Sequence, residues 1–121
     1  MRVAAVLFAL AAMTGGAFAQ QSPAEGNWAC VANIDGTKAG LLTIFGTSYG
    51  YASANYESKA SGTGNVQLAT DGVTFLDGNL VVGAGIVIGL ASIDANGRDI
   101  LTLQTSEKAV LSCVLRSLTA Y

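Results

Sequence analysis

Residues 26–34 have the sequence GNWACVANI. Large or apolar side chains recur at every second position from Trp28, through Cys30 and Ala32, to Ile34. A period of two places these four side chains on one face of a β-strand, with their neighbours on the other face. The stretch therefore predicts a strand with one buried face, close to the start of the chain.

The same pattern returns near the other end, where residues 109–117 have the sequence AVLSCVLRS. Leu111, Cys113 and Leu115 share one face of this expected strand, and Ser112 and Arg116 share the other. We expect Ser112 and Arg116 to point to solvent, because the apolar face is the one that a core would bury.

Cys30 and Cys113 are the two cysteines of the chain. We expect them to form a disulfide, because two cysteines in an exported protein have one way to pair, and no C-x-x-C motif or histidine favours a metal or redox site. Closing a loop of this length stabilises a fold by roughly 4–5 kcal/mol in the loop-entropy model. The bond would place Trp28 opposite Leu115 and make the first and last strands neighbours, so that the sheet closes on itself.

Export is predicted by residues 1–19. Met1 and Arg2 precede an apolar run that extends to Met13, and Ala17-Phe18-Ala19 has small residues at the two positions that a signal peptidase recognises. We expect cleavage after Ala19, a short polar leader over residues 20–25 and a single domain over residues 26–121, in the periplasm or outside the cell.

The remaining chain predicts strands and turns and no helix, because β-branched residues and glycines are frequent and no 3.6-residue period is sustained. The expected strands cover residues 27–34, 40–45, 49–56, 66–69, 73–76, 80–93, 99–104 and 109–117, with a polar loop over 57–65. The predicted fold class is all-β: an antiparallel up-and-down meander of about eight strands that closes into a barrel. A sandwich of two four-stranded sheets is the alternative.

Gly26-Asn27-Trp28 matches the G-x-W motif that opens the first strand of lipocalins and avidin-like proteins. The chain resembles these calycin-like families, and the resemblance implies a small exported barrel that holds a ligand at its open end. In those barrels a basic residue of the last strand often covers the tryptophan. Arg116 lies in the corresponding strand here, but the register above places it on the outer face. The motif is similar also to that of small periplasmic inhibitors of secreted metalloproteases.

Composition excludes several partners. Removing residues 1–19 takes away Arg2 and no acidic residue, which changes the formal net charge from −2 to −3. We therefore expect no nucleic acid partner, since nucleic acid requires clustered cations. No transmembrane helix is expected in the mature chain, because its longest apolar run is too short to span a bilayer of about 30 Å. A small outer-membrane barrel is a weaker alternative.

No pattern points to catalysis, a cofactor or a metal, so the chain is expected not to be an enzyme. Asp71 and Asp77 are each followed by glycine, as turns require, and are expected in turns rather than as a catalytic pair. Residues 92–99 partly match a calcium loop but lack its final glutamate, so the Asn96-Gly97 pair predicts a hairpin turn.

The candidate ligand or interface residues are aromatic: Trp28, Tyr49, Tyr51 and Tyr56. Tyrosine combines apolar area with a hydroxyl, which suits a ligand mouth or a protein interface, although the same residues could pack as ordinary barrel wall. The function predicted from sequence is a non-catalytic module that binds a small apolar ligand or a protein partner. The alternatives are a structural envelope protein without a ligand, or an inhibitor of a secreted protease.

Overall fold

Eight antiparallel strands and one short helix make up the described part of the chain. The structure is a computed structural model, which describes residues 22–55 and 58–117. The elements are, in order, β1 (Gly26–Ala32), β2 (Lys38–Phe45), β3 (Ser48–Ser53), β4 (Gly62–Ala69), β5 (Gly72–Phe75), α2 (Asn79–Ala84), β6 (Ile88–Ile93), β7 (Asp99–Gln104) and β8 (Ala109–Ser117). The expected signal peptide, residues 1–19, lies outside the described residues, as do Tyr56 and residues 118–121.

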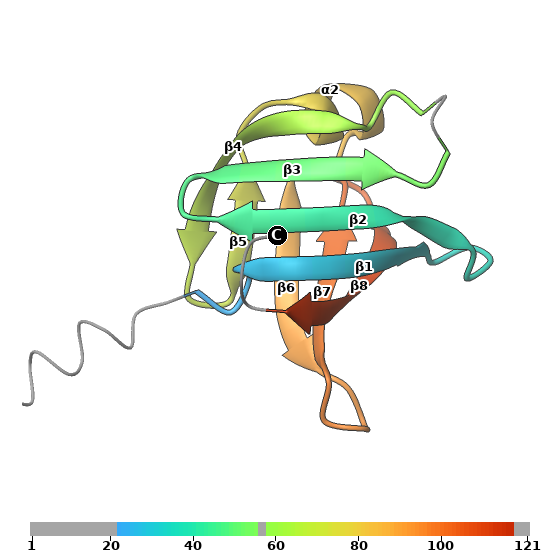
Figure 1. The fold of residues 1–121 in the computed structure, drawn as a ribbon, viewed down its shortest axis with the longest axis vertical. Coiled ribbons are helices and arrows are strands. Elements are labelled where there is room, and N and C mark those ends of the chain that lie inside the picture. The colour runs from blue at the N-terminus through green and yellow to red at the C-terminus, as the bar shows by residue number, and fades with distance from the viewer. Residues whose placement is uncertain (1–21, 56–57, 118–121) are drawn as a thin grey trace, which may run out of the picture.

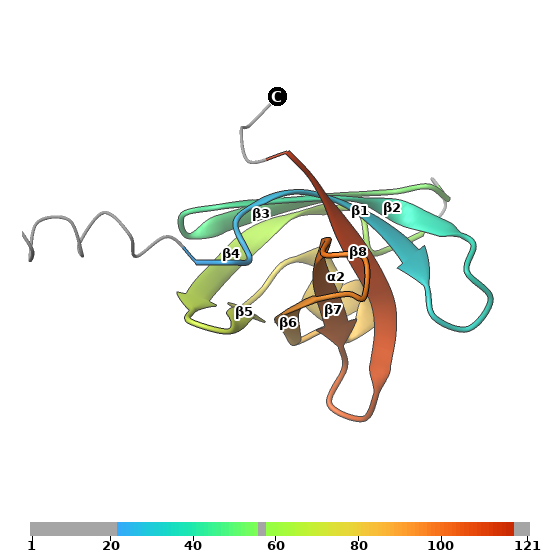
Figure 2. The same cartoon turned by 90° about the horizontal axis from the view of Figure 1, so that it is seen from below.

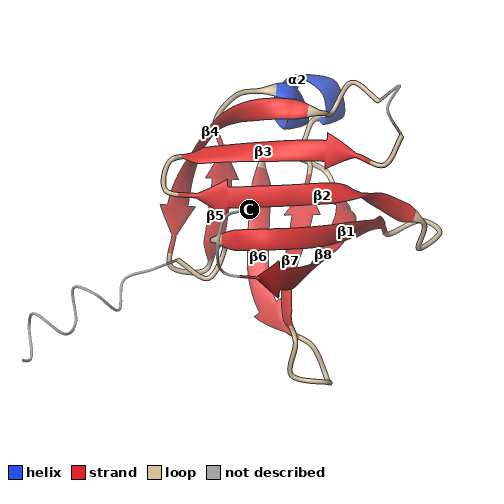
Figure 3. Cartoon of the chain, in the orientation of Figure 1, coloured by secondary structure: helices blue, strands red, loops and turns tan. Residues whose placement is uncertain are grey.

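The predicted barrel is confirmed. Each strand pairs with the next in sequence order, and β8 pairs with β1, which closes the ring (Figure 1). Figure 3 shows that strands form the wall of the barrel and that the helix lies at one end of it. Closure leaves no strand of the ring with an unpaired edge.

The register of the closing ladder is also the predicted one. Cys30 pairs with Cys113 and Trp28 with Leu115 along β1 and β8, and the two cysteines form a disulfide. Trp28 is buried, whereas Arg116 is exposed on the outer face. One disulfide bond therefore fixes which side of the first and last strands faces the core.

Large side chains fill the inside of the barrel. The side chains of the core residues are at most 9% exposed, and Trp28, Leu42, Ile44, Leu80, Ile86, Leu101 and Leu103 are at most 1% exposed. The rings of Tyr49 and Phe75 pack edge to face, with centroids 5.2 Å apart. A water-filled chamber would leave the residues that line it exposed, so these values describe a packed core rather than an open ligand chamber.

One end of the barrel is closed by residues 22–25, which precede β1. The indole Nε1 of Trp28 donates a hydrogen bond of 2.9 Å to the carbonyl of Ala24, which is fully buried. The hydroxyl of Ser22 lies 3.0 Å from the carbonyl oxygen of Ala69 and 3.2 Å from that of Gly72. Residues 22–25, the described part of the expected polar leader, are thus packed onto the barrel.

The helix α2 closes the other end, and it corrects the prediction of a single strand over residues 80–93. The chain forms α2 first and enters β6 only at Ile88. Gly78 precedes the helix at φ 89° and Gly85 ends it in the left-handed conformation, a common helix terminus. Figure 2, seen from below, shows α2 lying behind β7 and β8. The valines of this segment favour a strand locally, but the need to bury Leu80 across the barrel end prevails.

The boundaries of β3 and β4 also differ from those predicted. β3 ends at Ser53, and β4 begins at Gly62, inside the segment expected to be a loop over 57–65. Gly62 and Gly64 pair with Tyr51 and Tyr49 across the β3–β4 ladder. A Cβ on Gly64 would lie 2.5 Å from the ring of Tyr49, so the tyrosine ring requires glycine there. The first half of this strand, residues 62–65, is therefore defined by its neighbour, whereas Val66 and Leu68 give the second half an alternating apolar pattern of its own.

Candidate functional site

Three of the four aromatic residues predicted as a site lie in the core, and Tyr56 lies outside the described residues. Leu42 of β2 pairs with Trp28 on one side and with Tyr51 on the other. Tyr49 is the next inward residue of β3 and pairs with Ile44. The barrel thus brings these rings onto one inner wall.

The polar atoms of these rings form hydrogen bonds with backbone groups of the barrel. The hydroxyl of Tyr49 donates to the carbonyl of Asp77 at 2.9 Å and accepts the backbone N–H of Leu80 at 3.1 Å. The hydroxyl of Tyr51 donates to the carbonyl of Ala39 at 2.8 Å. Among the described residues, every buried side-chain nitrogen and oxygen has a hydrogen-bond partner. A ligand role for the aromatic residues stays a prediction, and the contacts seen hold the fold together.

Burial raises the pKa of both tyrosines. For Tyr49, loss of solvation is the largest cause, followed by the opposing hydrogen bond with Leu80 and by the charge of Asp77, which raises the pKa further. For Tyr51, loss of solvation acts alone. Both hydroxyls therefore stay protonated at neutral pH, as their donated hydrogen bonds require.

The acidic turn residues have local partners. Asn65 donates to the carboxylate of Asp77 from its backbone N–H at 2.7 Å and from its side-chain amide, and these bonds hold the pKa of Asp77 below its usual value. The carboxylate of Asp94 accepts from the backbone of Asn96 and from Arg98, which forms an ion pair with it at 2.9 Å. The expected hairpin turn at Asn96-Gly97 is confirmed, with Gly97 at φ 81°.

The outer wall of β1–β3 has a different character from the core. Alternation sends small and aliphatic side chains outward here: Ala29 and Val31 from β1, Leu41 from β2 and Ala52 from β3. Leu41 is 46% exposed and Val31 38% exposed. The wall is apolar without being covered by any described element.

A groove with a volume of about 640 Å³ follows this wall. We call it the outer groove, and its lining residues are Ala29, Cys30, Val31, Lys38, Gly40, Leu41, Ala52, Ser53, Ala54 and Arg116. A hollow of about 400 Å³ next to it shares Leu41 and Ala52 and continues toward Thr63 of β4. Together the two hollows extend the apolar surface over β1–β4.

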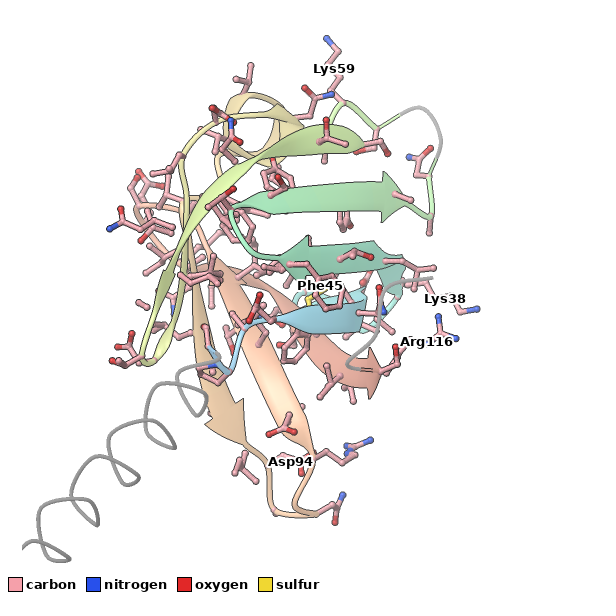
Figure 4. All side chains as sticks on the ribbon, turned by 60° about the vertical axis from the view of Figure 1, so that its left-hand side comes forward. Lys38, Phe45, Lys59, Asp94 and Arg116 are labelled. Carbon is pink, nitrogen blue, oxygen red and sulfur yellow. A yellow bond between two sulfur atoms is a disulfide. The ribbon has the colours of Figure 1, made fainter. Side chains whose placement is uncertain are left out.

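Two cations border the outer groove. Lys38 begins β2 and Arg116 lies near the end of β8, and both are exposed. Figure 4 labels both side chains, which lie at different positions along the groove: Lys38 near the Val31 end of β1 and Arg116 near its start. No acidic residue is among the residues that line the groove. Within residues 22–55 and 58–117, the ion pair found is Arg98–Asp94, so neither Lys38 nor Arg116 is neutralised by a described carboxylate.

A third hollow, of about 340 Å³, lies at the α2 end of the barrel. Tyr51, Leu80 and Ile86 contribute to its wall, and Lys38 contributes to this hollow as well as to the outer groove. Lys38 thus lies between the α2 end of the barrel and the outer wall. Of the residues predicted from sequence, Tyr51 is the one that reaches a surface hollow here.

Sequence reasoning missed the outer groove. The outward positions of β1–β3 carry small residues, which contribute little to a hydrophobic pattern, and Lys38 and Arg116 are 78 positions apart in the sequence. The signal that was available is the strand alternation, which places Arg116 on the outer face together with Ala29 and Val31 once the cysteines are paired.

The described residues hold neither a metal-ligand cluster nor a membrane-spanning helix. They contain no group of three or more histidine, cysteine or acidic side chains that could hold a metal ion. No helix among them is long and apolar enough to cross a membrane. Comparisons with family models, curated proteins and solved structures found no match to this chain.

Proposed function

We propose that this protein is an exported, non-catalytic binding module that docks a protein partner against the outer wall of β1–β3. The observation that carries the proposal is the contrast between the two faces of this wall. Its inner face is packed with buried aromatic and aliphatic side chains, whereas its outer face exposes Val31 and Leu41 beside a groove of about 640 Å³.

A protein fits this groove better than a small apolar ligand does. Ligand sites usually bury 70–90% or more of a small molecule, and they do so inside a concave pocket. The outer groove lies on the outside of a barrel and is open to solvent along the wall, so a small molecule would keep much of its apolar surface in water. A partner surface laid over the wall would cover Leu41, Val31 and the alanines together, which is how the apolar centre of a protein interface forms.

Export supports the proposal through two independent features. The pattern of residues 1–19 is that of a cleavable signal peptide. The disulfide between Cys30 and Cys113 is of the kind that persists in oxidising compartments. A partner would accordingly be another protein of the envelope or the extracellular space.

Site-specific photo-crosslinking in the producing cells tests the proposal. A photoreactive amino acid replaces Ala52, which is exposed in the outer groove, or Thr74 of β5, which is exposed on another part of the ring and lines neither of the two wall hollows. We expect a discrete crosslinked protein from position 52 and none from position 74. Equal labelling from both positions, or no crosslinked protein from position 52, would overturn the proposal and favour a structural protein without a partner.

A further inference from the structure

We infer that the outer groove takes an acidic segment of the partner protein, an extended stretch with aspartate or glutamate next to small apolar side chains. This inference rests on the proposed function and specifies the chemistry of the partner. Two observations carry it: the cations Lys38 and Arg116, which form no ion pair with a carboxylate of residues 22–55 and 58–117, and the small apolar side chains of the wall beside them.

Barrel closure is what brings the two cations to one groove. Lys38 pairs with Val31 in the β1–β2 ladder, and Val31 pairs with Ser112 in the β1–β8 ladder. Arg116 follows Ser112 by four residues on the same outer face, so the two cations lie on opposite sides of β1 and at opposite ends of it. Both line the outer groove, on a chain whose formal net charge is −2.

The charges favour an anionic occupant. Complementary charge steers a partner toward its site and selects against wrong partners, even where each ion pair adds little affinity. Arginine can hold a carboxylate through two parallel hydrogen bonds, and lysine adds a point charge. A carboxylate is the anionic group that a protein segment carries without modification.

The groove between the cations favours an extended segment. Ala29, Ala52 and Ala54 have small side chains, which lets the backbone of a partner approach the wall closely. The closed ring has no unpaired strand edge for a partner to extend, so recognition must use side chains. Alternating residues of an extended chain would place apolar side chains against Leu41 and Val31, and carboxylates at the border of the groove.

An anionic membrane is a poorer occupant than a peptide. Electrostatic attachment to acidic lipids uses clusters of about four to eight basic residues. The outer groove is lined by two basic residues, Lys38 and Arg116. Lys59, which Figure 4 also labels, extends from another part of the surface. Two cations in an apolar groove match one or two carboxylates of a single segment.

The test combines crosslinking from position 52 with removal of the cations. The double variant Lys38→Gln/Arg116→Gln is compared with Lys59→Gln/Lys108→Gln, which removes the same charge from exposed positions outside the outer groove. We expect the first pair to lower the crosslink yield by about fivefold or more, as the loss of two partly exposed ion pairs would, and the second pair to leave it unchanged. Near-ultraviolet circular dichroism checks that each variant retains the fold.

The crosslinked peptide is then identified by mass spectrometry and synthesised, once in its natural form and once with asparagine and glutamine in place of its acidic residues. We expect Asp or Glu within a few residues of the crosslink, and binding by calorimetry to the natural peptide alone.

Three results would overturn the inference while the docking function stands: a captured segment without acidic residues, an undiminished yield from Lys38→Gln/Arg116→Gln, or an equal loss from the control pair. A crosslink to a second copy of this chain or to lipid would overturn it as well. Absence of any crosslink from position 52 overturns the docking function itself, and the inference with it.

Discussion

At the scale of single residues, the hydroxyl of Tyr49 joins the inner wall of β3 to the start of α2. It accepts the N–H of Leu80, one of the helix N-terminal groups that has no partner within the helix, and donates to the carbonyl of Asp77. Gly78, between them, has φ 89°, and a Cβ there would meet the same hydroxyl. One buried side chain thereby takes the place of the side-chain cap that α2 lacks.

Replacing this hydroxyl tests its role. Tyr49→Phe leaves the buried N–H of Leu80 unpaired, and we expect the free energy of unfolding to fall by about 1–3 kcal/mol in urea titrations. The control is Tyr51→Phe, which removes one of two hydroxyl donors to the Ala39 carbonyl, the other being Ser53, and should cost about 1 kcal/mol or less. If the two variants lost the same free energy of unfolding, the hydrogen bond from Leu80 to Tyr49 would contribute no more to stability than the bond of Tyr51 does.

Alkaline pH tests the burial of the same rings. Because the folded-state pKa values of Tyr49 and Tyr51 are raised, the folded form holds its protons more tightly than the unfolded form does. Their contribution to stability is complete below the unfolded pKa of about 10 and is lost as the pH rises through the higher folded values. Tyrosinate absorbance should therefore show two of the four tyrosines ionising late, together with unfolding. Simultaneous ionisation of all four before unfolding would contradict the buried placement.

At the scale of elements, α2 shows where sequence patterns stop being informative. A helix of six residues is not stable alone, and the valines at positions 81 and 82 favour a strand. The helix exists because Leu80 is fully buried at the end of the barrel and because Gly78 and Gly85 allow the chain to turn. By contrast, β1 and β8 were predictable, since each carries its own alternation and a cysteine that fixes the register.

Two substitutions within α2 separate its buried and exposed sides. Leu80→Ala should lower the free energy of unfolding by about 2–5 kcal/mol, because it leaves a cavity under the helix. Val82→Ala, on a side chain that is 85% exposed, should change it by no more than about 0.5 kcal/mol. Chemical denaturation measures both variants, and similar effects would mean that α2 does not close the barrel end in solution.

At the scale of the whole molecule, the barrel is closed twice, by the β1–β8 ladder and by the disulfide within it. The closure and the strand order could be predicted, because the cysteines lie near the two ends of an alternating, turn-rich chain. The packed interior and the outer groove could not, since both depend on how side chains from several strands meet. The outer groove needs β1, β2, β3 and β8 in place before Lys38 and Arg116 line the same surface.

Removing the covalent closure should weaken the barrel without opening it. The double variant Cys30→Ala/Cys113→Ala keeps the ladder, and we expect the same far-ultraviolet circular dichroism with a free energy of unfolding about 2–5 kcal/mol lower. Amide exchange across β1 and β8 should accelerate while the pairing persists. A variant as stable as the oxidised protein would show that the ladder alone determines closure.

The central claim is that this barrel binds a partner on its outer wall, because side chains fill its interior. Native mass spectrometry of the protein, purified from its producing cells without denaturation, tests that claim most directly. A core whose hydrophobic residues are at most 9% exposed predicts the mass of the disulfide-bonded polypeptide, alone or with a protein partner. A stoichiometric small molecule that leaves only when the protein unfolds would contradict it.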